Sequence, residues 1–129
     1  MKNFWLLAVI GLSACREDET VSGYLDDHTR FTLQSLNGAP FIPEATIDLS
    51  KTGQVTGRAP CNTYSANQTA LYPWFNLGPI AATKAACPAL DQEQKFFSVL
   101  GRATLVEVAG KTLILSNTDG VELIFQADS

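Results

Sequence analysis

Histidine and clustered basic residues are scarce in this sequence, and each shortage removes a class of function. The chain has one histidine, and its 9 lysine and arginine residues stand against 13 aspartate and glutamate residues, for a formal net charge of −4. Nucleic-acid binding depends on clustered cations that release counterions from phosphates, so we expect no nucleic-acid partner. A catalytic hydroxyl needs a base within reach, and the lone His28 is not expected near Ser65 or Thr83. We therefore do not expect an enzyme.

Long apolar runs are also missing. The run at residues 4–12 is about nine residues long, far below the roughly 20 that a membrane-spanning helix needs. It follows the basic Lys2 and precedes small residues, which is the order of an export signal. Residues 12–15, "LSAC", resemble the bacterial lipobox, in which the cysteine is acylated and the chain is cut just before it. We expect residues 1–14 to be a lipoprotein signal peptide and Cys15 to carry the lipid.

The expected lipid predicts where the protein acts. Several acyl chains make membrane attachment effectively permanent, whereas one chain alone binds only marginally. Position 16 is Arg16, and the lipobox resemblance associates aspartate there with inner-membrane retention, so we expect the outer membrane, facing the periplasm. Residues 15–28 are charged and aperiodic, which predicts a lipidated N-terminus and a solvated acidic tether. Residues 29–127 are long enough for one domain, and we expect a monomer.

Cysteine is the next scarce residue, with 3 in the chain and no Cys-x-x-Cys pair. If Cys15 carries lipid, Cys61 and Cys87 remain in an oxidising compartment, where pairing is the default expectation. The alternative is a redox-active thiol, but His28 lies in the expected tether, where it could hardly lower a thiol pKa. A disulfide would also remove both sulfurs as metal ligands, and the carboxylates show no ligand spacing, so no metal or other cofactor is expected.

Short β-strands account for most of the remaining pattern. Residues 30–38, 45–57 and 103–127 alternate apolar and polar side chains and contain turn pairs such as Asn37-Gly38, whereas prolines limit residues 70–83 to short or edge strands. In the first of these stretches Phe31, Leu33 and Ser35 are expected on one face, and residues 57–66 look like a turn.

One segment has a helical pattern. Asp91 is expected to accept N–H groups of the first turn, with Gln94 completing a capping box and Gly101 ending the helix. Phe96, Val99 and Leu100 share one face. Many short strands and one helix predict an α+β domain. We expect a strongly curved, mostly antiparallel sheet or an incompletely closed β-barrel of about seven strands, with the helix covering an opening.

Several short motifs are similar to those of the META/HslJ-like domain family. They are "CNTYS" at residues 61–65, "IAATKAAC" at 80–87, Glu93 in the helix and "LILSNTDGVELIF" at 113–125. Phe31 stands where the family commonly has tryptophan, and Pro60 where it has glycine. The resemblance implies a curved-sheet or cracked-barrel domain, anchored or exported, associated with envelope stress, heat shock or antibiotic tolerance. It implies no agreed catalytic activity.

Two groups of residues are candidates for a binding site. Asn62, Tyr64 and Thr83 belong to the motifs, and they either line a ligand mouth or serve the fold, Asn62 in an Asx-turn and Thr83 by tying down the facing loop. Tyr72, Trp74 and Phe75 form either an exposed recognition patch or part of the core. If this stretch is a regular strand, alternation places Tyr72 and Trp74 on one face and Phe75 with Leu77 on the other.

Together these features predict a non-catalytic, lipid-anchored envelope protein that binds or protects an unidentified envelope component. The alternative is a carrier of a small apolar ligand inside the curved sheet. That alternative requires a cavity, and a core packed solid by phenylalanine would exclude it; the candidates are Phe31, Phe96, Phe97 and Phe125.

Overall fold

The computed structural model describes residues 18–25 and 28–128. The expected signal peptide, residues 1–14, and Cys15 lie outside the described residues. The elements, in chain order, are the 3₁₀-helix η1 (Val21–Tyr24), β1 (Arg30–Leu36), β2 (Ala39–Pro40), β3 (Thr46–Asp48), β4 (Gln54–Arg58), β5 (Thr63–Asn67), β6 (Ala81–Ala82), α1 (Leu90–Leu100), β7 (Leu105–Ala109), β8 (Thr112–Ser116) and β9 (Glu122–Ala127). Within the described part of the chain, no helix has the length and apolarity needed to cross a bilayer.

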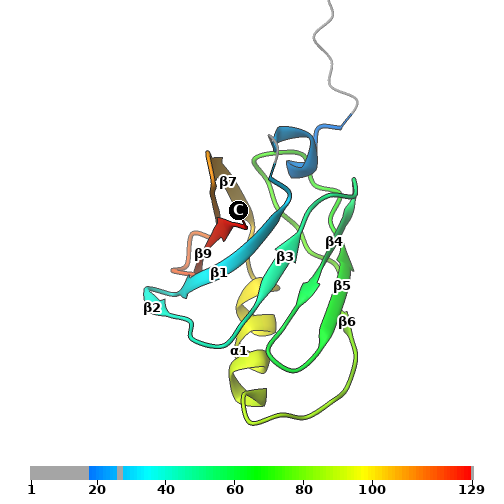
Figure 1. Cartoon of the computed structure of the whole chain (residues 1–129). Helices are drawn as coiled ribbons and strands as arrows, with labels where there is room; N and C mark the ends of the chain where they lie inside the picture. Colours follow the sequence, from blue (N-terminus) through cyan, green and yellow to red (C-terminus); the bar gives the residue numbers. More distant parts are fainter. Residues whose placement is uncertain (1–17, 26–27, 129) are drawn as a thin grey trace, which may run out of the picture.

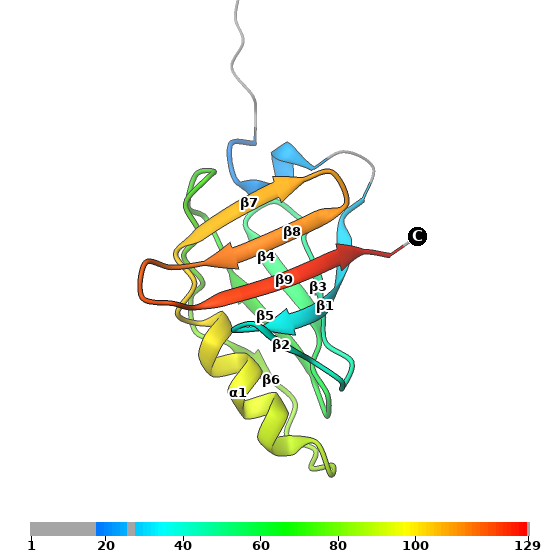
Figure 2. The same cartoon turned by 90° about the vertical axis from the view of Figure 1, so that its left-hand side faces the viewer.

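All strand pairs are antiparallel and belong to one sheet of nine strands. The strand order is β6-β5-β4-β3-β1-β9-β8-β7, with β2 paired to β1 outside this path. The sheet bends so that β7, β8 and β9 lie in front of β3, β4 and β5 in Figure 2, and α1 lies at one end of the strands. The two ends of the path, β6 and β7, do not pair with each other, so the sheet is not closed. The expected α+β class is confirmed.

The strand count is nine rather than about seven for two reasons. β2 and β6 contain 2 residues each, too short to leave a periodic pattern in the sequence. In addition, β5 begins at Thr63, inside the stretch at residues 57–66 that was expected to be a turn. The turn covers only Pro60 and Cys61, because the Ala59 N–H donates to the Asn62 carbonyl at 2.7 Å and closes a tight hairpin between β4 and β5.

The C-terminal hairpins follow the predicted pattern closely. Val121, Leu123 and Phe125 are buried on one face. The two turns contain Gly110 and Gly120 at φ 61° and 97°, where a side chain would be strained. Local turn chemistry and period-2 alternation therefore suffice to specify β7 to β9.

The alternation predicted for β1 is wrong at its end. Phe31 and Leu33 are buried, but Ser35 is half-exposed and Leu36 takes the buried position. The pairing of β1 with β9 shifts register between Leu33 and Ser35. An extra residue in the bulge moves the following side chain to the opposite face, which a strict period of two cannot anticipate.

The helix also differs from prediction at its start. Its N-cap is Ala89, with no side-chain hydrogen bond, so the capping box of Asp91 and Gln94 is wrong. Asp91 lies inside the first turn instead, where its charge still complements the helix dipole. The apolar face of Phe96, Val99 and Leu100 is buried as predicted, and the helix ends at Gly101 with right-handed φ of −68°. That this helix covers an opening of the curved sheet stays a prediction.

The interior is filled by aromatic rings. Four phenylalanines are among the largest fully buried side chains: Phe31, Phe75, Phe96 and Phe125. Phe97, expected in the same core, is half-buried and packs against it. The edge of the Tyr64 ring meets Phe96 and Phe97 at centroid distances of 5.7 and 5.4 Å. This packing argues against an apolar ligand inside the sheet, and we do not carry that alternative further.

The segment expected to be a solvated tether is docked over its described part. Thr20 and Val21 are buried, and Tyr24 stacks on Tyr72 with ring centroids 4.4 Å apart. The Glu19 carbonyl accepts the Tyr72 N–H at 2.8 Å. Burial of these few side chains between charged neighbours holds the segment on the domain, so the tether prediction for residues 15–28 is corrected for residues 18–25. Figure 1 shows η1 at the end of the molecule opposite α1.

Candidate functional site

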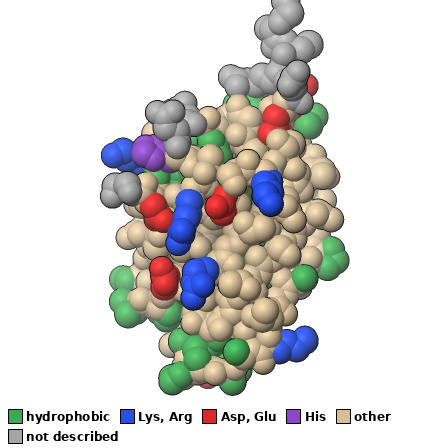
Figure 3. Space-filling view, turned by 45° about the vertical axis from the view of Figure 1, so that its right-hand side comes forward, with side chains coloured by type: hydrophobic (Ala, Val, Ile, Leu, Met, Phe, Trp, Pro, Cys, Tyr) green, Lys and Arg blue, Asp and Glu red, His purple; other side chains and the backbone are tan. Residues whose placement is uncertain are grey.

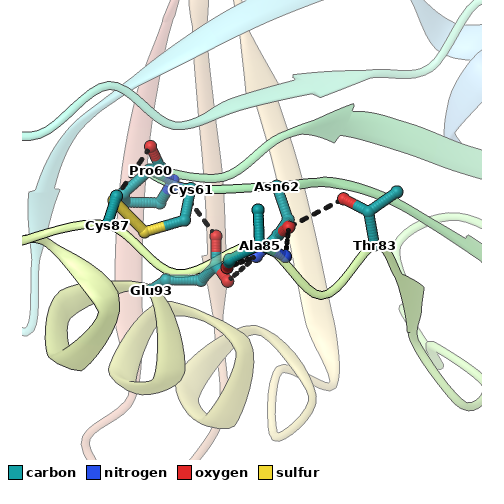
Figure 4. The surroundings of a disulfide bond; sticks show 7 residues. All are labelled: Pro60, Cys61, Asn62, Thr83, Ala85, Cys87 and Glu93. Carbon is teal, nitrogen blue, oxygen red and sulfur yellow. Dashed lines mark hydrogen bonds between the residues drawn. A yellow bond between two sulfur atoms is a disulfide. The ribbon is translucent and has the colours of Figure 1, made fainter.

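The Cys61–Cys87 disulfide marks the centre of the candidate site. Its Cα atoms are 5.5 Å apart, and the bond joins the β4–β5 turn to the segment just before α1 (Figure 4). The predicted pairing is confirmed. Pro60 fits the turn because its ring precedes Cys61 in the two-residue loop, where its missing N–H is not needed to close the hairpin.

Asn62 uses its whole side-chain amide beside this disulfide. Its Oδ1 accepts the Ala85 N–H at 2.7 Å and the Thr83 hydroxyl at 2.8 Å. Its Nδ2 donates to the Ala85 carbonyl at 2.9 Å and to the Glu93 carboxylate at 2.6 Å. The amide therefore clamps the backbone of the β6–α1 loop at Ala85 (Figure 4). The predicted Asx-turn is wrong, since these partners lie on the facing loop and on α1.

Thr83 ties down the facing loop, as one of the two interpretations predicts. Its backbone N–H donates to the Thr63 carbonyl at 3.2 Å, and its Oγ1 accepts the Thr63 N–H at 3.3 Å. The same hydroxyl donates to Asn62. The hydroxyl therefore both donates and accepts a hydrogen bond, and it links β5 to the loop.

Glu93 belongs to the family motifs, but the sequence pattern does not predict its role in this network. Its side chain comes from α1 and is only 3% exposed. The carboxylate accepts the Cys61 N–H at 2.8 Å and the Asn62 amide at 2.6 Å. Acidic residues are almost never buried without partners, and here both partners lie in the disulfide turn. The available signal is its position three residues before Phe96, on the apolar face of the helix.

The ring of Tyr64 is buried in the core, 4% exposed. Its hydroxyl donates to the Thr46 carbonyl at 2.7 Å, and burial raises the pKa of this hydroxyl. The neighbouring Gly57 gives it room: a Cβ there would lie 2.2 Å from the Thr46 carbonyl oxygen and 2.8 Å from the Tyr64 hydroxyl. The backbone of β4 at Gly57 therefore lies close to the Tyr64 ring, which packs in the core.

An open hollow of about 370 Å³ lies between the β6–α1 loop and α1. Its lining includes Asn62, Thr83, Lys84, Glu93, Gln94 and Phe97. Two of the three predicted mouth residues therefore reach this hollow, and Tyr64 does not. Lys84 and Gln94 are exposed at its rim, whereas Asn62 and Glu93 form its inner wall with polar groups already engaged.

The predicted aromatic patch divides into three different environments. Phe75 is 1% exposed and belongs to the core, so its place in an exposed patch is wrong. Tyr72 is half-buried, stacks on Tyr24, and accepts the Val108 N–H on its hydroxyl at 3.2 Å. Trp74 is 60% exposed. The segment is not a regular strand, because residues 71–74 form a turn in which the Trp74 N–H donates to the Leu71 carbonyl at 2.8 Å.

The described residues, 18–25 and 28–128, can be compared with the patterns of a metal site and of a nucleic-acid-binding surface. No group of three or more His, Cys, Asp and Glu side chains in this range is placed to hold a metal ion. On the face shown in Figure 3, acidic and basic side chains lie next to one another. Mixed charge of this kind does not form the basic stripe that nucleic-acid binding uses.

Solved structures share this fold. A protein from Burkholderia xenovorans, solved by NMR, is 20% identical with a TM-score of 0.64, and the match covers 95% of this chain and 98% of that one. A second NMR structure is 22% identical with a TM-score of 0.60, covering 77% and 88%. A DUF4847 family protein from Bacteroides vulgatus is 16% identical with a TM-score of 0.54, covering 64% and 57%. No curated protein matches the chain significantly.

The family assignment comes from the sequence match. The model of the META domain matches residues 24–129, so the match begins at Tyr24, inside the docked segment, rather than at residue 29. The match includes the disulfide, the Asn62 clamp and the terminal hairpins. The chain belongs to the META domain family.

Proposed function

We propose that this protein is a lipid-anchored, non-catalytic binding protein of the bacterial cell envelope. The "LSAC" sequence at residues 12–15 supports acylation of Cys15, and Arg16 favours the outer membrane, facing the periplasm. The disulfide supports an oxidising compartment, because structural disulfides persist in exported proteins and are rare in the cytosol. The stress setting that the family resemblance implies, heat shock or antibiotic tolerance, is part of this proposal.

The hollow beside the disulfide is the proposed binding site. The observation that carries the proposal is the Asn62 clamp, which holds the β6–α1 loop through the Ala85 backbone. A loop fixed in this way keeps the hollow open without a ligand, and preorganisation lowers the cost of binding. The rim combines the Lys84 cation, the Gln94 amide and the half-buried Phe97, which suits a peptide segment of an envelope protein.

Binding rather than catalysis follows from how the polar groups are used. The Thr83 hydroxyl, the Asn62 amide and the Glu93 carboxylate are hydrogen-bonded to one another or to the backbone. A nucleophile needs a free hydroxyl with an adjacent base, and a general acid or base needs access to substrate. These groups are better suited to hold a surface in shape.

The anchor is tested by growing expressing bacteria with a clickable fatty acid. The wild-type protein should take up label, and Cys15→Ala should take up none and lose its association with the membrane. Ser13→Ala, which keeps the cysteine and a small residue before it, is the matched control and should be labelled. Label on Cys15→Ala would overturn the assignment of the lipid to this residue.

The binding site is tested by in-cell crosslinking and recovery of the protein with its partners. Ala86→Trp places a large side chain at the hollow and should reduce recovery of the crosslinked partner. Ala109→Trp adds the same side chain at the exposed last residue of β7, outside the hollow, and should not reduce this recovery. Equal recovery with both variants would mean that the partner binds elsewhere.

A further inference from the structure

A small apolar surface lies beside the docked N-terminal segment. Leu71 and Trp74 are 55% and 60% exposed. Trp74 forms an isolated bridge with Leu105 of β7, and the Val106 N–H donates to the Pro73 carbonyl at 2.9 Å. Because Leu105 is directly opposite Trp74 in this bridge while Val106 is buried, Leu105 extends the same outer surface. We call Leu71, Trp74 and Leu105 the tryptophan patch.

The docked segment joins this patch to the N-terminus. Tyr72, between the two exposed patch residues, donates its N–H to the Glu19 carbonyl and stacks on Tyr24. At the start of the segment, Asp18 Oδ2 accepts the Thr52 hydroxyl at 2.8 Å. The chain is therefore fixed to the domain from Asp18 onward, next to the patch. In Figure 1 the end of the molecule that carries η1 is also where the chain enters the domain.

The distance between the proposed lipid and this contact is short. Three residue steps separate Cys15 from Asp18, and an extended chain spans at most about 3.6 Å per residue, or about 11 Å. The headgroup layer on one side of a bilayer is about 5–7 Å thick. A lipid on Cys15 therefore leaves no room for a long tether and brings the η1 end of the domain to the membrane surface.

We propose that the tryptophan patch rests on the lipid bilayer, with the indole of Trp74 at the boundary between headgroups and acyl chains. This inference rests on the proposed acylation of Cys15. Tryptophan has an apolar body and an N–H donor, and it is enriched at this boundary in membrane proteins. The exposed leucine adds apolar area, and the nearby Glu19 and Glu107 are acidic, so the contact is apolar rather than an attraction to anionic lipid.

The chain provides its own probe for this contact. Of its 2 tryptophans, Trp5 lies in the expected signal peptide, which leaves Trp74 as the single tryptophan of the mature protein. The lipoprotein is purified from bacterial membranes, its acylation is verified by mass, and it is placed in vesicles with brominated acyl chains. Trp74 fluorescence should lose most of its intensity. The loss should be similar with phosphatidylcholine alone and with added phosphatidylglycerol.

A matched variant moves the probe to the other end of the domain. Ile42 is 86% exposed in the β2–β3 connection, far from η1 in Figure 1. Trp74→Phe combined with Ile42→Trp should show little quenching in the same vesicles. Equal quenching of both proteins, or none of the acylated wild type, would overturn the inference and leave the patch to a protein partner. A mature protein without acyl chains would instead overturn the proposed function.

Discussion

Two regions of this domain reach a defined structure by different means. The hairpin region, residues 105–127, is built from alternating side chains and glycine turns. The disulfide region, residues 58–93, contains the regular strand β5, but the rest is a two-residue strand, a long connection and the start of a helix without a side-chain N-cap. Outside β5, the turn and the β6–α1 loop are joined by one covalent bond and by the hydrogen bonds of Asn62 and Glu93. The hairpin region is thus specified by its repeating side-chain pattern, whereas the loop beside the disulfide is held by polar and covalent cross-links.

The largest expected effect lies in the hairpin region. Phe125→Ala removes a fully buried ring and should lower the free energy of unfolding by about 3–5 kcal/mol, since lost transfer energy and a residual cavity add together. Urea unfolding followed by circular dichroism measures the change. Ile124→Ala, at the half-exposed neighbouring position, is the control and should cost clearly less. Similar losses in both variants would mean that the hairpin region does not depend on its inner face.

Loss of the disulfide should cause the second-largest decrease in the free energy of unfolding. Cys61→Ser should lower the free energy of unfolding by about 3.5 kcal/mol in the chain-entropy model, because the bond closes a loop with a sequence separation of 26. Cys87→Ser and the double variant should give the same value, since each removes the same cross-link. Additive losses would show that the sulfurs contribute separately. Amide exchange should rise mainly in the disulfide region and not in β7 to β9.

Removal of the Asn62 clamp should cause the next-largest decrease in the free energy of unfolding. Asn62→Ala removes one partner each from the Glu93 carboxylate and the Thr83 hydroxyl and two from the Ala85 backbone, and it should cost about 1–3 kcal/mol. Asn67→Ala, the same change at an exposed position of β5, should stay within about 0.5 kcal/mol. Both values come from urea unfolding. A cost at position 67 equal to that at position 62 would contradict the role of the network.

The smallest effect concerns the docked segment. Desolvation raises the pKa of the Asp18 carboxyl, but hydrogen bonds from Thr20 and Thr52 outweigh it and hold the pKa below its usual value of 3.8. A lowered pKa in the folded state stabilises above the unfolded value and loses this contribution as pH falls through the folded value. Because solvent screens this largely exposed carboxyl, Asp18→Asn should cost at most about 0.5 kcal/mol at neutral pH. The cost should shrink as the pH falls below 3.8.

The pH dependence of the stability loss should distinguish Asp18 from a carboxylate that holds no segment in place. Asp119→Asn, in the exposed β8–β9 turn, is the control from the hairpin region and should show no comparable difference between neutral and acid pH. Unfolding curves of both variants against the wild type at the two pH values give the comparison. A cost for Asp18→Asn that is unchanged in acid would mean that its carboxylate charge does not hold the segment.

The same contrast explains how much could be predicted from sequence. In the hairpin region the turns at Gly110 and Gly120 and the buried face of β9 follow from local pattern. The disulfide follows from cysteine count and compartment. The clamp could not be predicted, because the Asn62 amide bonds to Ala85, a residue 23 positions away whose side chain carries no signal. The docked segment was missed because its Val21 and Tyr24 are isolated among charges and depend on Tyr72.

The clamp on Ala85 has one more consequence. Asn62 holds this loop through a peptide N–H and a carbonyl, groups that every residue other than proline provides. The bonds to Asn62 use only the backbone of Ala85, and the side chains of Lys84, Ala85 and Ala86 are exposed. Substitution of these three residues should therefore change the chemistry of the surface beside the hollow while the loop keeps its course.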